Sequence, residues 1–238
     1  MDVDSRALRR SRSGAGLTES TPQGITVDAA VVLAIDMSGS VSDDRVRLQF
    51  QGYAAALRNP AFLPALRRGR TGRVALTFVE WSEAQRQEQA VGWRIIRDAG
   101  DRDAFVTAML EADRPTPGWT SISGAIDFAA GLLRYGGFVT DRRVIDISGD
   151  GENNDGRSVA EARDAAVAAG ITINGLPITD VEPELEAYYR RNVIGGQNSF
   201  LIAATGMQAF TEAVLRKLLV EIAGGPPEAA LRRAGFAR

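Results

Sequence analysis

The stretch Val31-Val-Leu-Ala-Ile35, followed at once by Asp36-Met-Ser-Gly-Ser40, decides the fold of this 238-residue chain. A continuous apolar run of this length is typical of a strand buried on both faces, as in parallel sheets. The small polar residues after it mark the point where the strand ends. The sequence therefore predicts a central strand with a functional loop at its carboxyl end.

Strands and helices alternate along the rest of the chain. Further strands are predicted at 73–81, with a short partner near 93–96, and at 143–147, 171–176 and 200–203. Helices are predicted at 43–57, 102–112, 121–135, 158–169, 182–192 and 207–222. Such alternation is typical of βαβ units, so we expect an α/β fold: a doubly wound, mostly parallel, six-stranded sheet with helices on both faces.

The same pattern divides the chain into one domain and two ends. Residues 1–24 are expected to be a flexible leader, 25–223 one domain, and 224–238 a flexible tail that begins Gly-Gly-Pro-Pro. The leader is basic but lacks the apolar stretch of an export signal, which leaves the compartment open. No segment has the roughly 18 apolar residues that a membrane span needs.

The composition excludes most catalytic chemistry. The chain has neither Cys nor His, so thiolate nucleophiles, Cys- or His-ligated metal sites and Ser-His-Asp triads are ruled out. Lysine occurs once, at Lys217, which excludes a P-loop and which we expect to be a solvated charge. The formal net charge of −2 argues against a nucleic-acid partner bound through its phosphates.

Three separate stretches bring oxygen-bearing side chains to the ends of predicted elements. Ligands of an open parallel sheet bind beyond the carboxyl ends of its strands, where the strand order reverses. The strands before Asp36 and Asp150 are expected to be central neighbours, and Thr120 precedes a helix. One site is therefore expected to contain Asp36, Ser38, Ser40, Thr120 and Asp150. Such oxygen ligands suit a hard divalent cation, Mg²⁺ above all, with Mn²⁺ or Ca²⁺ as alternatives.

This ligand set favours binding over catalysis. Neutral hydroxyl ligands would leave most of the cation's charge uncancelled, while the two aspartates act best through water. An under-neutralised cation with a vacant position attracts an external carboxylate, so we expect a protein partner that presents Asp or Glu. Trp81, Trp119 and Glu152 are candidates for the rim that such a partner would contact.

The stretches Asp36-Met-Ser-Gly-Ser40, Gly118-Trp-Thr120 and Asp146-Ile-Ser-Gly-Asp150 resemble the metal-ion-dependent adhesion site of the von Willebrand factor A domain. The resemblance covers roughly residues 27–223. It implies that Ser38, Ser40 and Thr120 bind Mg²⁺ through their hydroxyls. It also implies that Asp36 and Asp150 act mainly through water and that a partner's Glu or Asp completes the coordination.

A narrower similarity points to one branch of these proteins. The stretches at 78–82, 143–151 and 172–175 are similar to a bacterial branch of von Willebrand A-like proteins with no assigned activity. Members of that branch are often exported.

Other interpretations of the same residues stay open. Ser40 and Thr120 could instead cap the helices that follow them. The loop Asp150–Gly156 could be read as a calcium loop, although its glycine falls one position later than in an EF-hand. An enzyme alternative is a Mg²⁺-dependent phosphotransferase of haloacid-dehalogenase type with Asp36 as nucleophile, but Ser38 stands where that chemistry needs a second carboxylate. A third alternative is a metal-free scaffold.

Overall fold

The structure, a computed structural model, describes residues 24–238 except 113–117, 181, 225, 234 and 237–238. The leader expected at 1–24 therefore lies, apart from Gly24, outside the described residues. The described main sheet has five strands in the order β4-β3-β2-β6-β7, with only β4 antiparallel to its neighbour. Its strands are β2 (Ala29–Asp36), β3 (Val74–Trp81), β4 (Gln87–Ile96), β6 (Arg143–Gly149) and β7 (Ile171–Pro177). A small parallel pair joins β1 (Ile25–Thr26) and β5 (Phe138–Val139).

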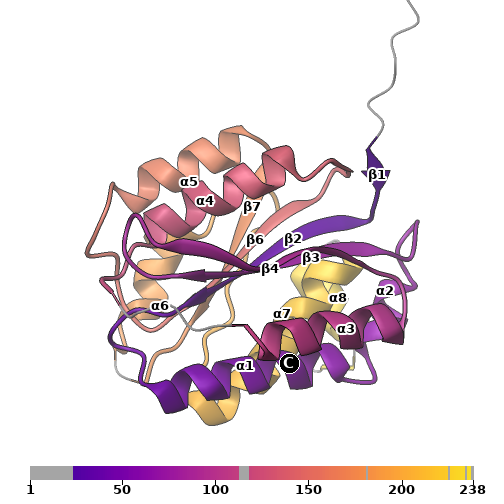
Figure 1. The fold of residues 1–238 in the computed structure, drawn as a ribbon, viewed down its shortest axis with the longest axis horizontal. Helices are drawn as coiled ribbons and strands as arrows, with labels where there is room; N and C mark the ends of the chain where they lie inside the picture. The colour runs from indigo at the N-terminus through magenta and orange to yellow at the C-terminus, as the bar shows by residue number, and fades with distance from the viewer. Residues whose placement is uncertain (1–23, 113–117, 181, 225, 234, 237–238) are drawn as a thin grey trace, which may run out of the picture.

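Helices cover both faces of this sheet, as expected (Figure 1). One face is covered by α1 (Asp43–Arg58), α2 (Phe62–Leu66), α3 (Ala99–Leu110), α7 (Met207–Ala223) and α8 (Pro227–Arg233). The other is covered by α4 (Ile122–Tyr135), α5 (Val159–Ala168) and α6 (Leu185–Tyr188), which continues as the π-helix η1 (Tyr189–Val193). The α/β prediction is confirmed.

The buried run of β2 explains why both faces need helices. Val31, Leu33 and Ile35 pack into the core under α1 and α7. Val32 and Ala34 pack into the opposite core, under α4 and α5. Because successive side chains of a strand point to opposite faces, an uninterrupted apolar strand fills two cores at once.

The prediction of six strands is wrong by one. Residues 200–203, expected to be the last strand, lie beside β7 but make only isolated bridges, Gly175 with Leu201 and Ile178 with Ala204. Pro177 of β7 accepts a hydrogen bond from Ala204 N at 2.9 Å but has no N–H to donate in return. Proline on this edge therefore interrupts the ladder.

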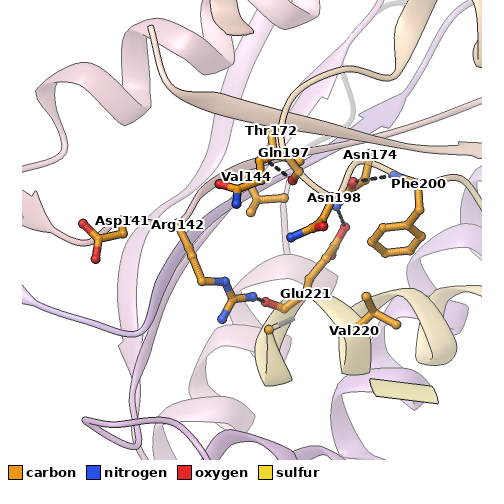
Figure 2. Close-up of a pocket in the computed structure, with 11 residues that line it drawn as sticks. Asp141, Arg142, Val144, Thr172, Asn174, Gln197, Asn198, Phe200, Val220 and Glu221 are labelled. Carbon is orange, nitrogen blue, oxygen red and sulfur yellow. Dashed lines mark hydrogen bonds between the residues drawn. The ribbon is translucent and has the colours of Figure 1, made fainter. Parts of the chain in front are cut away.

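Lys217 is buried, which corrects the prediction of a solvated charge. Its side chain has 0% exposure, pairs with Asp146 of β6, and donates to Glu221 Oε1 at 2.7 Å. Asn174 of β7 donates to the same oxygen at 2.9 Å, beside a pocket lined by Arg142 and other polar residues (Figure 2). Lys217 lies on the buried face of α7, between this helix and β6, because its neighbours on that face are apolar.

The region after Gly224 also differs from the expected flexible tail. Residues Pro227–Arg233 form α8, which packs against α7 and buries Ala230. Within the described part of the chain, no helix is long and apolar enough to cross a bilayer.

Candidate metal-binding site

The site lies at the switch point of the sheet. The neighbours of β2 are β3 on one side and β6 on the other, and all three run parallel. Asp36 is the last residue of β2, and Asp150 directly follows the last residue of β6. The two strands are central neighbours, as predicted, so both carboxylates emerge at one edge.

A chain of hydroxyl and carboxylate groups connects the two strand ends. Ser38 N donates to Asp36 Oδ1 at 2.7 Å, and the hydroxyls of Ser38 and Ser40 lie 3.1 Å apart. The Ser40 hydroxyl then donates to Asp150 Oδ1 at 2.7 Å. Four of the five predicted residues therefore form one continuous series of contacts at this edge of the sheet.

Thr120, the fifth predicted residue, is brought to the same place by its backbone. Its N–H donates to Asn154 Oδ1 at 2.9 Å, and its carbonyl accepts from Asn154 N, also at 2.9 Å. Gly39 N donates to the Gly118 carbonyl at 2.8 Å, which ties the loop before Thr120 to the serine loop. A Cβ on Gly151 would lie 4.0 Å from Thr120 Oγ1, so the hydroxyl lies against the loop after Asp150.

Neighbouring serines cap the two helices that begin here. Ser42 caps α1 by accepting from Arg45 N at 3.4 Å, and Ser121 caps α4 by accepting from Gly124 N at 3.2 Å. Ser40 and Thr120 therefore do not have the capping roles that were the simpler alternative for them. Their hydroxyls remain available at the site.

The Asp36 side chain is fully buried against Gly149 of β6. It has 0% exposure, and its Oδ2 has no hydrogen-bond partner among the described residues. A Cβ on Gly149 would lie 2.8 Å from both this oxygen and the hydroxyl of Tyr189, so only glycine fits there. Burial, opposed by hydrogen bonds from Ser38 and assisted by the charge of Asp150, raises the pKa of Asp36 to about 7.

The acidic loop after Asp150 serves as a brace. Asn153 Oδ1 accepts from Ser123 N at 3.0 Å, Asn154 Oδ1 accepts from Thr120 N, and Asp155 Oδ2 accepts from Ala84 N at 2.7 Å. These side-chain oxygens accept from backbone N–H groups of segments far away in the sequence, and so fix the loop to its neighbours. This use favours the polar-loop interpretation of the segment over a calcium loop.

Of the three residues predicted to form a rim for a partner, two are exposed and one is buried. Trp119 is 67% exposed and borders a hollow of about 540 Å³, which Ser40, Thr120 and Glu83 also line. Glu152 is exposed. Trp81 has 0% exposure and packs into the core under α4, so its assignment to the rim is wrong. It ends β3 in register with Asp36, where both faces of the strand are covered.

Arg45 is a residue of the site that the sequence did not predict. Its Nη1 donates to Asp150 Oδ2 at 3.2 Å, and its Nη2 pairs with Asp180 after β7. Arg45 lies in the first turn of α1, where the helix dipole disfavours a cation. An arginine in the first turn of a predicted helix was the one feature of the sequence that pointed to anions near Arg45.

The donor set fits a hard cation bound chiefly by hydroxyls. The Ser38 and Ser40 hydroxyls and the Asp150 carboxylate are in contact, and Thr120 lines the same hollow as Ser40. Asp36 Oδ2 is a buried acceptor without a hydrogen-bond partner among the described residues. Among the described residues, no group of three or more His, Cys, Asp or Glu side chains gathers as a metal cage would require.

Several solved structures share the fold of this chain. The chain matches proximal thread matrix protein 1 from the mussel byssus with a TM-score of 0.61 at 14% identity, over 82% of this chain and 48% of that one. It matches a von Willebrand factor type A protein from Catenulispora acidiphila with a TM-score of 0.59 at 15% identity, over 82% and 43%. The pilus adhesin SpaC from Lactobacillus rhamnosus GG matches with a TM-score of 0.56 at 13% identity, over 82% and 30%. The chain has the von Willebrand factor A fold and spans less than half the length of these proteins.

The family is narrower than the fold. Residues 26–226 match the family described as "Protein of unknown function (DUF1194)", and the chain belongs to this family. No curated protein matches the chain.

Proposed function

We propose that this protein is a metal-dependent protein-binding module. Ser38, Ser40 and Thr120 hold a divalent cation, Mg²⁺ in the first instance, and Asp36 and Asp150 act on it through water. When bound, the cation supplies an uncancelled positive charge that attracts an Asp or Glu side chain of a partner. The observation that carries the proposal is the Ser38–Ser40–Asp150 chain of hydroxyl contacts, formed by residues that the helix caps leave unused.

The protein's own residues prepare this site. Asp36 orients Ser38 by accepting from its backbone N–H, and Asp150 orients Ser40 by accepting from its hydroxyl. The Asn154 brace holds Thr120 in position from the loop after Asp150. The three loops are therefore pre-organised, which lowers the entropy lost on binding.

The position of Lys217 disfavours the phosphotransferase alternative. Phosphoryl transfer needs a cation that stabilises the developing charge on the phosphate. Lys217, the only lysine in the chain, is buried with Asp146 and Glu221 beneath α7 and is therefore not available at the strand ends. Arg45 does lie at the strand ends, but its guanidinium is already paired with Asp150 and Asp180. A binding role requires no such group.

Two proteins with similar folds support a role in metal-dependent binding. One structure of the mussel thread protein, 16% identical with a TM-score of 0.61 over 84% of this chain, is described with a zinc-occupied MIDAS motif. SpaC is described as a pilus adhesin. For this chain, the exposed Trp119 beside Thr120 offers an aromatic surface that a partner could cover.

The decisive experiment is isothermal titration of Mg²⁺ and Mn²⁺ into chelator-stripped protein, with Ser38→Ala and Ser42→Ala side by side. Both variants remove one hydroxyl from the same loop. We expect Ser38→Ala to abolish one-site binding with an unchanged circular dichroism spectrum. Ser42→Ala should bind as the wild type does and lose only the helix cap, about 1 kcal/mol of stability.

Asp150→Ala, which changes the loop after β6, is a second variant for the same titration. It should also abolish cation binding, because Ser40 loses its orienting acceptor. Equal affinity in the wild type, Ser38→Ala and Asp150→Ala would overturn the proposal and leave the metal-free scaffold as the better reading.

A further inference from the structure

Arg45 bridges two loops at the edge of the candidate site. Its guanidinium donates to Asp150 Oδ2 at 3.2 Å and pairs on its other side with Asp180. The Arg45 side chain is 19% exposed and that of Asp150 is 3% exposed. The contact to Asp150 uses the oxygen that Ser40 does not, so Asp150 is shared between a hydroxyl and a cation.

The surroundings of Asp150 are strongly acidic. Burial, followed by the charges of Glu152 and Asp150, raises the pKa of Glu182, which places these three carboxylates near one another. Asp180 adds a fourth on the far side of Arg45. A rim of this charge favours a divalent cation but repels the carboxylate of a partner, since like charges close together cost free energy.

We propose that Arg45 is the specificity-determining counter-charge of this site, which weakens cation binding and in return lets the site accept an anionic partner. The inference rests on the proposed function and names a residue that tunes it. Arg45 offsets part of the negative charge around Asp150, so a bound cation would keep more of its positive charge toward a partner. Without Arg45, the neighbouring carboxylates would dominate the approach of a partner.

The test compares Arg45→Gln with Arg47→Gln. Both substitutions remove one positive charge from α1, but Arg47 is exposed and pairs only with Asp44 in the structure's described part. Titration of Mg²⁺ into each chelator-stripped protein should show Arg45→Gln binding about tenfold more tightly than the wild type. Arg47→Gln should bind within about twofold of the wild type.

A second readout follows the anion. With Mn²⁺ at the site, water-proton relaxation reports how much acetate is needed to displace water from the ion. Arg45→Gln should require at least about fivefold more acetate than the wild type. Arg45→Lys keeps the charge but loses the two-sided contact of the guanidinium, so it should lie between the wild type and Arg45→Gln. Opposite changes in cation and acetate affinity cannot arise from simple damage to the fold.

Each outcome is decisive. Mg²⁺ and acetate affinities of Arg45→Gln that match those of Arg47→Gln would overturn the role of Arg45 while leaving the metal site intact. Mg²⁺ binding by Arg45→Gln but not by the wild type would support the role of Arg45 and overturn the proposed function. Absence of binding in both proteins would overturn both.

Discussion

Lys217 of α7 forms an ion pair with Asp146 in the middle of β6, and both side chains are buried. Lys217 also donates to Glu221 one turn further along α7, and Glu221 accepts from Asn174 of β7. The cluster therefore joins the last long helix to two strands of the sheet. Because a buried charge is costly unless it is paired, these contacts hold α7 in one register against the sheet.

Removing the cation from this cluster should destabilise the protein strongly. At about pH 8, above the raised pKa of Asp146, we expect Lys217→Met to lower the free energy of unfolding by about 3–5 kcal/mol, because two buried carboxylates then lack a counter-charge. Urea denaturation followed by circular dichroism measures this loss.

The matched control removes all three charges at once. The triple variant Lys217→Met, Asp146→Asn, Glu221→Gln should recover most of the loss, since no uncompensated charge remains buried. A Lys217→Met protein as stable as the wild type would show that the ion pair does not restrain α7.

Stability should also fall as the pH rises. Burial, followed by the charge of Glu221, raises the pKa of Asp146 to about 7, although Lys217 acts in the opposite direction. In the unfolded chain the pKa of an aspartate is about 4, so between these values the folded protein holds more protons than the unfolded one. The contribution is therefore full below about pH 4 and is lost as the pH rises through about 7.

Urea midpoints of the chelator-stripped protein, measured from about pH 5 to about pH 8, check this sign. Asp36, whose pKa is also raised to about 7, contributes in the same direction. Asp146→Asn should flatten part of the decline and leave the part that Asp36 causes. A free energy of unfolding that rises over this range would contradict the assignment.

The sequence predicted the α/β alternation because the apolar run of β2 and the largely apolar β6 and β7 are each followed by a helical pattern. It did not predict the buried place of Lys217. The spacing of Lys217 and Glu221 is visible in the sequence, but the third member, Asp146, lies 71 positions before Lys217 in another element. Only the packing of α7 on β6 brings them together.

The sequence also predicted only part of the candidate site. Asp36, Ser38, Ser40, Thr120 and Asp150 come together because strand ends and a helix start meet at one edge, which the order of elements foretells. Arg45 reaches the site through its long side chain, which a pattern of elements cannot describe. Trp81 ends a strand that is buried on both faces, so no alternation of polar and apolar residues distinguished rim from core.

The two tryptophans near the site should respond differently to truncation. Trp81→Ala should lower the free energy of unfolding by about 3–5 kcal/mol, because it leaves a cavity in the core under α4. Trp119→Ala should change it by no more than about 0.5 kcal/mol, since that side chain is 67% exposed. Urea denaturation of both variants distinguishes the core residue from the rim residue, and equal losses would refute the difference.

Gly149 sets the floor of the candidate site, and its replacement should affect both stability and cation binding. A Cβ at this position would lie 2.8 Å from Asp36 Oδ2 and from the hydroxyl of Tyr189. Gly149→Ala must therefore displace Asp36 or Tyr189, and we expect a loss of about 1–3 kcal/mol in unfolding free energy. Because Asp36 orients Ser38, Mg²⁺ affinity measured by titration should fall as well.

Gly92→Ala is the control for this change. Gly92 is also a strand glycine, but nothing lies within 4 Å of a Cβ built there. Its substitution should leave the Mg²⁺ affinity unchanged and should not lower the stability, because alanine is no worse than glycine within a strand. If Gly149→Ala and Gly92→Ala behave alike in both measurements, Asp36 is not confined by the backbone beneath it, and its position must depend on the serine loop alone.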